Sequence, residues 1–306
     1  MRIYLILFLF SILSCQKKNS DWIDRSKHEG LYDLNYSESF ETYCTEQNPK
    51  DIKNTVDYLE QAKDYFDKTF KEELNFAVLF VDNKNWDKYA FAPPPGMPQS
   101  YYDGNIVLGS GQSVMANRWK QSLNQNPEIE IDSLKLIFGE DLNLDLFFRD
   151  ALSLHELGHL YQFYKTSDKS QRRWLNEVFG NLCQVAAANN LITKDVLTRM
   201  DYFQFLLIDE NLWGDITFKS LDQFENNYFE IINQGKNYGW YQTQFYIIAK
   251  KLYLQFGDEF LNDFRNFLID IDPEKIGMIE NKKLTEKMVK AFGQEALEIM
   301  NWKHDG

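Results

Sequence analysis

The chain has 306 residues, 44% of them hydrophobic, and a net charge of −13. This length and composition allow a large hydrophobic core in one or two domains. Because the acidic residues are spread along the chain, no basic face is expected for phosphate groups, which argues against a nucleic-acid partner and against charge-driven binding to anionic membranes.

The N-terminus is typical of an export signal. A positively charged start precedes an apolar run over residues 3–13, which is too short to span a bilayer. Ser14 directly before Cys15 at the end of this run resembles the lipobox of bacterial lipoproteins. The resemblance implies that a signal peptide, residues 1–14, is removed and that Cys15 is lipidated, so that the protein is anchored to the bacterial cell envelope. Residues 15–38 are then expected to be a tether or spacer. An ordinary signal peptide with an incidental cysteine is the alternative.

The first half of the mature chain carries both helix and strand patterns. Apolar residues at helical spacing predict a helix over residues 51–71. Short apolar runs predict strands over 76–81 and 105–109, whereas the prolines of 92–98 exclude a regular element there. These elements predict an α+β lobe over residues 39–141.

From residue 142 onward the hydrophobic pattern is nearly all helical. Helices are predicted over residues 142–165, 173–191, 241–256 and 283–302. We therefore expect a mainly helical lobe, residues 142–306, after the α+β lobe. A cleft between two such lobes is a common place for an active site.

Two of the four histidines stand four residues apart, in His155-Glu156-Leu157-Gly158-His159. On a helix this spacing puts both imidazoles on one face, where they can bind a single metal ion. The intervening Glu156 is rotated by about 100°, so it can reach a water molecule rather than the ion. Two nitrogen ligands and an adjacent base are what a catalytic zinc site needs. A pair of buried structural histidines is the alternative.

A catalytic zinc site also needs a third protein ligand. The other two histidines are poor candidates, because His28 lies in the predicted spacer and His304 near the C-terminus. A carboxylate is therefore expected. Glu177 lies within an apolar helical segment, where an unpaired carboxylate would be costly. A surface glutamate, or one that pairs with Arg173, is the alternative.

Residues 155–159 (HELGH) and 174–177 (WLNE) together resemble the gluzincin zinc metallopeptidases, most closely the aminopeptidase-N-type branch. Seventeen residues separate His159 from Glu177, one fewer than is usual in that branch. The resemblance implies a zincin-like fold with the active-site helix at the cleft. It also implies one Zn²⁺ held by His155, His159 and Glu177, with Glu156 as a catalytic residue.

The same resemblance suggests roles for three further residues. Asn181 stands where the family commonly has an aspartate that orients the first histidine, so we expect it in the second shell, accepting the imidazole N–H through its carbonyl. Tyr241 fits best as the tyrosine that stabilises the oxyanion, with Tyr238 as the alternate. Both tyrosines could instead be packing residues. Residues 105–109 are expected to offer the sheet edge that binds a peptide.

These patterns predict an exported, lipid-anchored zinc metallopeptidase that acts on a peptide or protein substrate. The chain has no segment like the G-x-M-E-N of aminopeptidases, so cleavage within a chain or at its end stays open. The rival hypothesis is a non-catalytic binding or scaffold lipoprotein on a zincin-like frame, and a non-peptidase hydrolase is a further possibility. Cys44 and Cys183 could form one disulfide or could be buried as small apolar residues.

Overall fold

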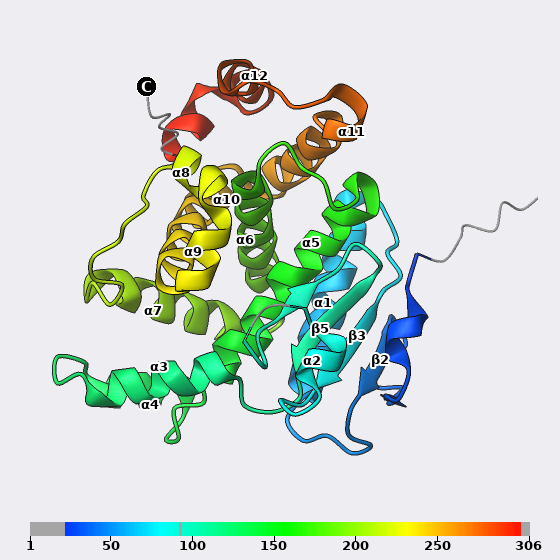
Figure 1. Ribbon diagram of the computed structural model, residues 1–306, viewed down its shortest axis with the longest axis vertical. Helices are drawn as coiled ribbons and strands as arrows, with labels where there is room; N and C mark the ends of the chain where they lie inside the picture. The colour runs from blue at the N-terminus through cyan, green and yellow to red at the C-terminus, as the bar shows by residue number, and fades with distance from the viewer. Residues whose placement is uncertain (1–21, 92–93, 301–306) are drawn as a thin grey trace, which may run out of the picture.

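The computed structural model describes residues 22–91 and 94–300, and its architecture is α+β, as the sequence predicts (Figure 1). A mixed sheet lies along one side of a larger helical body. Among the described residues, no helix is both long and apolar enough to cross a membrane. The predicted signal peptide, residues 1–14, and Cys15 lie outside the described residues, so the lipid anchor stays a prediction.

Within the described residues the sheet has five strands in the order β1-β2-β3-β5-β4. The three central strands are parallel, and a short antiparallel strand lies at each edge. The strands are β1 (Tyr32–Asp33), β2 (Glu41–Cys44), β3 (Ala77–Val81), β4 (Gln99–Ser100) and β5 (Asn105–Gly109). The predicted strands over 76–81 and 105–109 are confirmed as β3 and β5. However, β5 is not an edge, because β4 pairs with it.

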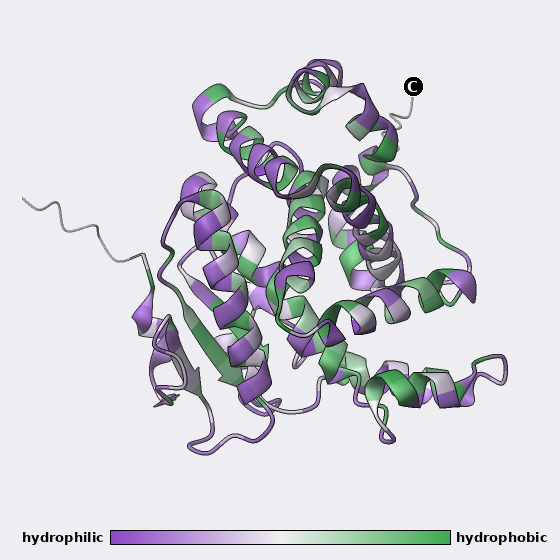
Figure 2. Cartoon of the chain, turned by 180° about the vertical axis from the view of Figure 1, so that it is seen from behind, coloured by the Kyte–Doolittle hydropathy of each residue, from purple (hydrophilic) through white to green (hydrophobic). Residues whose placement is uncertain are grey.

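Strands β3 and β5 are buried on both faces, which explains why their sequences are mostly continuous apolar runs. Val78 and Phe80 point into the main core, whereas Leu79 and Val81 pack with Trp86 in a small cluster on the opposite face. Figure 2 shows the apolar colouring of these strands and of the inward faces of the helices.

The helices make up most of the chain. They are η1, a 3₁₀ turn (Arg25–His28), α1 (Lys53–Phe70), α2 (Trp86–Tyr89), α3 (Val114–Gln125), α4 (Ile131–Phe138), η2, a π-helical turn (Leu146–Ala151), α5 (Leu152–Thr166), α6 (Arg173–Asn190), α7 (Asp195–Asp209), α8 (Leu221–Asn226), α9 (Tyr228–Gln234), α10 (Lys236–Asp270), α11 (Pro273–Ile276) and α12 (Asn281–Met300). Helix α5 lies between the sheet and α6, and α10 packs on α6 (Figure 1).

One hydrophobic core runs from α1 through the sheet to α12. The predicted boundary between residues 141 and 142 therefore does not separate two cores, because helices on both sides of it share this one. Cys44 and Cys183 are both buried, free thiols within it. The disulfide left open by the sequence is not formed.

The predicted spacer is wrong from Trp22 onward, because this segment folds against the sheet. The Trp22 indole donates a hydrogen bond to the Asn75 carbonyl at 2.6 Å. Ile23 is buried, and the Nε2 of buried His28 lies 2.8 Å from Asn105 Oδ1. Strand β1 then pairs with β2. A few apolar and aromatic side chains among polar ones are enough to fix this segment.

Two helical predictions need correction. The helix predicted from residue 142 begins later, since Leu142 has a positive φ of 47° and the π-helical turn η2 precedes α5. The helix predicted over 241–256 begins already at Lys236, whereas its predicted end agrees with the non-helical backbone at Gly257, after which a second helical part of α10 continues to Asp270. Helices α3 and α4, within the predicted α+β lobe, were missed by the sequence patterns.

Buried polar contacts fix the helix that carries the two histidines. Arg265 of α10 donates from Nε and Nη2 to the Tyr161 carbonyl of α5 at 3.0 and 2.9 Å, and it also pairs with Glu72. Tyr161 follows His159 by two residues. At the other end of α5, the Asp150 carboxylate in η2 accepts hydrogen bonds from Thr55 of α1 and from Arg149. Hydrogen bonds thus hold α5 to α10 beyond the histidines and to α1 just before its first residue.

Candidate metal centre

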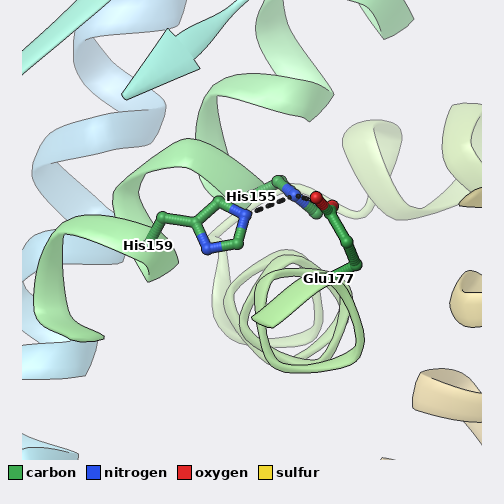
Figure 3. Close-up of side chains that lie close together, drawn as sticks. All are labelled: His155, His159 and Glu177. Atoms are coloured by element: carbon green, nitrogen blue, oxygen red, sulfur yellow. Dashed lines mark hydrogen bonds and ion pairs between the residues drawn. The ribbon is translucent and has the colours of Figure 1, made fainter. Parts of the chain in front are cut away.

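The structure brings the three predicted ligands together. His155 and His159 project from α5 and Glu177 from α6, and the three side chains converge on one point (Figure 3). The two Nε2 atoms are 2.9 Å apart, and His155 Nε2 is 3.5 Å from Glu177 Oε2. All three ligand atoms lie within 4.8 Å of one another. Each residue is less than a tenth exposed.

These distances suit a tetrahedral zinc ion. Bonds of about 2.0–2.2 Å to nitrogen and oxygen put neighbouring ligand atoms about 3.4 Å apart, which lies between the two measured values. A second feature fits as well. His159 Nδ1 and Gln162 Oε1, one turn apart, are both buried without a hydrogen-bond partner among the described residues. A metal on Nε2 would place the proton on Nδ1 and so supply the donor that Gln162 Oε1 lacks.

The charges within the cluster are strongly coupled. Burial and repulsion from His155 lower the pKa of His159 to about 4, so this ring is neutral and can offer a lone pair. Burial opposes charge on His155 as well, but the contact with Glu177 and the charge of Glu156 outweigh it and raise its pKa. Burial would raise the pKa of Glu177, yet the histidines and Gln242 hold it below its usual value. The cluster therefore presents an ionised carboxylate beside a neutral imidazole.

Glu156 lies beside the cluster without belonging to it. Its Oε2 accepts a hydrogen bond from the Ser100 hydroxyl at 2.7 Å. Burial raises its pKa above the ordinary value for a glutamate. Ser100 belongs to β4, the antiparallel edge strand, so this edge lies next to the carboxylate. Nothing in the sequence around this two-residue strand indicates the contact.

Two glycines allow α5 and α6 to approach closely at the site. A Cβ on Gly158 would lie 2.4 Å from the Cβ of Cys183, and a Cβ on Gly180 would lie 2.7 Å from the ring of His155. Real side chains do not tolerate such contacts. A glycine in a helix interior lowers helix stability by about 1 kcal/mol relative to alanine. The close packing that Gly158 permits compensates for this loss. The close approach is what puts Glu177 within reach of the imidazoles.

The structure separates the two candidate tyrosines. Tyr238, in the first turn of α10, lines the site, and its hydroxyl is 3.4 Å from Glu177 Oε1. Tyr241 instead donates its hydroxyl to the Ser220 carbonyl at 2.6 Å and is buried among aromatic rings, including Phe224. The preference for Tyr241 is therefore wrong on position, and the alternate residue occupies the site. Both tyrosines lie within α10, and the packing of α10 on α6 brings the earlier one to Glu177.

Asn181 acts on a different ligand from the one predicted. Its amide nitrogen donates to the Glu177 carbonyl at 2.8 Å and to Gln242 Oε1 at 3.0 Å, rather than contacting His155. Gln242 Nε2 in turn donates to Glu177 Oε2 at 2.7 Å. Asn181 therefore orients the carboxylate ligand through Gln242. The sequence did not indicate Gln242, because only the α6–α10 packing brings it to the site.

The candidate ligands and Glu156 line one cavity of about 260 Å³. Its other walls are aromatic and polar side chains from β4, α5, α6, α9 and α10: Ser100, Phe163, Arg173, Asn176, Tyr228 and Tyr238. Phe163 stacks on the ring of His159, with 5.5 Å between the centroids. The alternative in which Arg173 pairs with Glu177 is wrong, because its carboxylate neighbour is Glu225, at 3.9 Å.

Comparisons with known proteins do not assign this site to a family. No protein-family model, no curated protein and no solved structure matches the chain. What the site can do must therefore be inferred from its own side chains.

The close approach of Gly180 to the imidazoles predicts that a larger residue there weakens metal binding. Gly180→Ala should lower zinc affinity by at least about tenfold, because the new methyl group displaces the ring of His155 and such overpacking strains the ligand geometry. Zinc affinity can be measured by competition with a chromogenic chelator. Gly111→Ala is the matched control, since a Cβ there meets no atom within 4 Å. Equal affinities for the two variants would contradict this role of Gly180.

The hydrogen bond to the carboxylate predicts a second effect. Gln242→Leu should weaken zinc binding by about 10–100-fold, because Glu177 loses the donor that fixes its Oε2. Gln255→Leu on the same helix is the control, since its side chain bonds to Glu295 at an exposed position. Circular dichroism would verify that both variants are folded. Unchanged affinity in Gln242→Leu would show that the carboxylate needs no such support.

Proposed function

We propose that the protein is a zinc-dependent metallopeptidase with a zincin-like arrangement of helix, edge strand and metal centre. The observation that carries the proposal is the position of Glu156. It lines the same cavity as the ligand cluster but is not one of the three candidate ligands. A carboxylate in that position can handle protons at a water molecule beside the metal. The resemblance of the HELGH and WLNE segments to gluzincins points the same way.

His155, His159 and Glu177 would hold the ion, leaving a fourth position open toward the cavity. A zinc ion bound there would lower the pKa of a water molecule to near neutrality and polarise the substrate carbonyl. Glu156 would take the proton of the attacking water and return it to the leaving nitrogen. Its raised pKa makes it a stronger base than an ordinary glutamate, so it would accept the proton of the water more readily.

Tyr238 is the candidate that would stabilise the oxyanion. Burial and the charge of Glu177 raise its pKa well above the usual value, so its hydroxyl stays protonated and can donate. Tyr238 lines the same cavity as His155, Glu156 and His159, where its hydroxyl would meet a bound carbonyl. Strand β4, bonded to Glu156 through Ser100, would align an extended peptide as an additional strand.

The rival function is a binding or scaffold protein with a structural zinc. A structural site of that kind normally has four protein ligands, and the cluster has three. It would also gain nothing from a buried carboxylate with a raised pKa beside the metal. These two features favour the hydrolase.

The decisive experiment compares zinc content with hydrolysis. The wild type should bind one zinc per chain. It should also cleave bonds in a defined peptide mixture, and mass spectrometry would identify the products. Glu156→Gln should keep the zinc but lose activity by about 10²–10⁴-fold, the usual contribution of a general base. His159→Ala should lose the zinc. Undiminished cleavage by Glu156→Gln would contradict the mechanism, and a metal-free wild type would favour the scaffold.

The lipid anchor is part of the proposed setting of this enzyme, because the sequence places a lipobox-like segment before Cys15. Expression of the full chain in a bacterium should give a mature protein that begins with a lipidated Cys15. Mass spectrometry of the N-terminal peptide tests this, with Cys15→Ser as the control. An unmodified Cys15 in the mature protein would rule out the anchor.

A further inference from the structure

The wall of the cavity carries a cation that the proposed chemistry does not use. Arg173 is the first residue of α6 and stands four residues before Glu177, on the same face of that helix. One helical turn of this length corresponds to about 6 Å along the axis. Its side chain is 46% exposed and lines the cavity with the metal cluster.

Two aromatic rings lie against this guanidinium. The Arg173 Cζ lies 4.7 Å from the centroid of the Tyr228 ring and 5.7 Å from that of Phe229. A cation–π contact is an electrostatic attraction to the ring and does not use up the N–H donors of the guanidinium. The rings therefore position the arginine without consuming its hydrogen bonds.

The nearby carboxylate does not neutralise this arginine fully. Glu225 Oε2 is 3.9 Å from Arg173 Nη1, beyond hydrogen-bond distance. The other oxygen of Glu225 accepts the backbone N–H of Trp174 at 3.0 Å. Glu225 is thus engaged by the start of α6, and Arg173 keeps donors for another acceptor.

Arg173 is also the one Lys or Arg side chain among the described residues that line the cavity. It therefore offers an anion a cationic partner on the cavity wall, in a chain whose net charge is −13. A planar guanidinium recognises a carboxylate by two parallel hydrogen bonds.

We propose that Arg173 binds a carboxylate of the substrate and so sets the substrate class as peptides with an acidic group within one or two residues of the cleaved bond. An extended peptide advances about 3.4 Å per residue, so about two residues cover the spacing of about 6 Å along α6. The carboxylate can come from a C-terminus or from an acidic side chain. This inference rests on the proposed hydrolase function.

Binding to a zinc-loaded Glu156→Gln variant tests the inference without turnover. Three blocked alanine tripeptides serve as probes: one ending in an amide, one ending in a free carboxylate, and one amidated peptide with a glutamate in place of the last alanine. We expect at least one of the two acidic peptides to bind about tenfold more tightly than the neutral one by calorimetry, as a charge-assisted hydrogen bond would give. The stronger of the two identifies the source of the carboxylate.

Adding Arg173→Gln should abolish this preference, and Arg173→Lys should retain part of it. Arg118→Gln is the matched control, because it removes one positive charge from an exposed position on α3. Equal binding of all three peptides, no binding at millimolar concentration, or a preference that survives Arg173→Gln would each overturn the assignment. Since binding is measured on a variant without the base, this result is independent of whether the wild type cleaves peptides.

Discussion

The close contact between α5 and α6 is the constraint on which the site depends. Gly158 and Gly180 remove the side chains that would hold these helices apart, and Cys183 fills the resulting contact. The same contact brings Glu177 of one helix to the two imidazoles of the other. The π-helical turn before α5 and the Arg265 contacts after the histidines keep α5 from shifting away from this position. The geometry of the candidate metal centre and the packing of the core are therefore set by the same helix contact.

The parts of the site that sequence could predict are those that depend on a single element. The four-residue spacing of His155 and His159 fixes their common face on any helix. Glu177 could be inferred because an isolated carboxylate in an apolar helix needs a partner, and the structure supplies that partner in the histidines. The strands β3 and β5 were predictable for a similar reason, since burial on both faces leaves a continuous apolar run.

The parts that could not be predicted depend on contacts between elements. Tyr238 and Tyr241 have the same chemistry, and only the packing of α10 on its neighbours decides which of them lines the cavity. Gln242 and Ser100 reach the site from segments whose local patterns carry no sign of it. The segment after Trp22 looked like a spacer because its polar residues outnumber the few that dock, yet those few determine its path.

The groups around the ligands give the site a particular charge balance. Neutral amides, Asn181 and Gln242, support the carboxylate ligand, and the amide of Gln162 lies next to His159. An aspartate at position 181 would add a third negative charge near a bound ion, whereas Asn181 and Gln242 orient the carboxylate of Glu177 without adding charge. The bound ion would thus keep more of its charge for the substrate. A cavity with that balance, and with Arg173 on its wall, is better suited to an anionic substrate than a carboxylate-rich one would be.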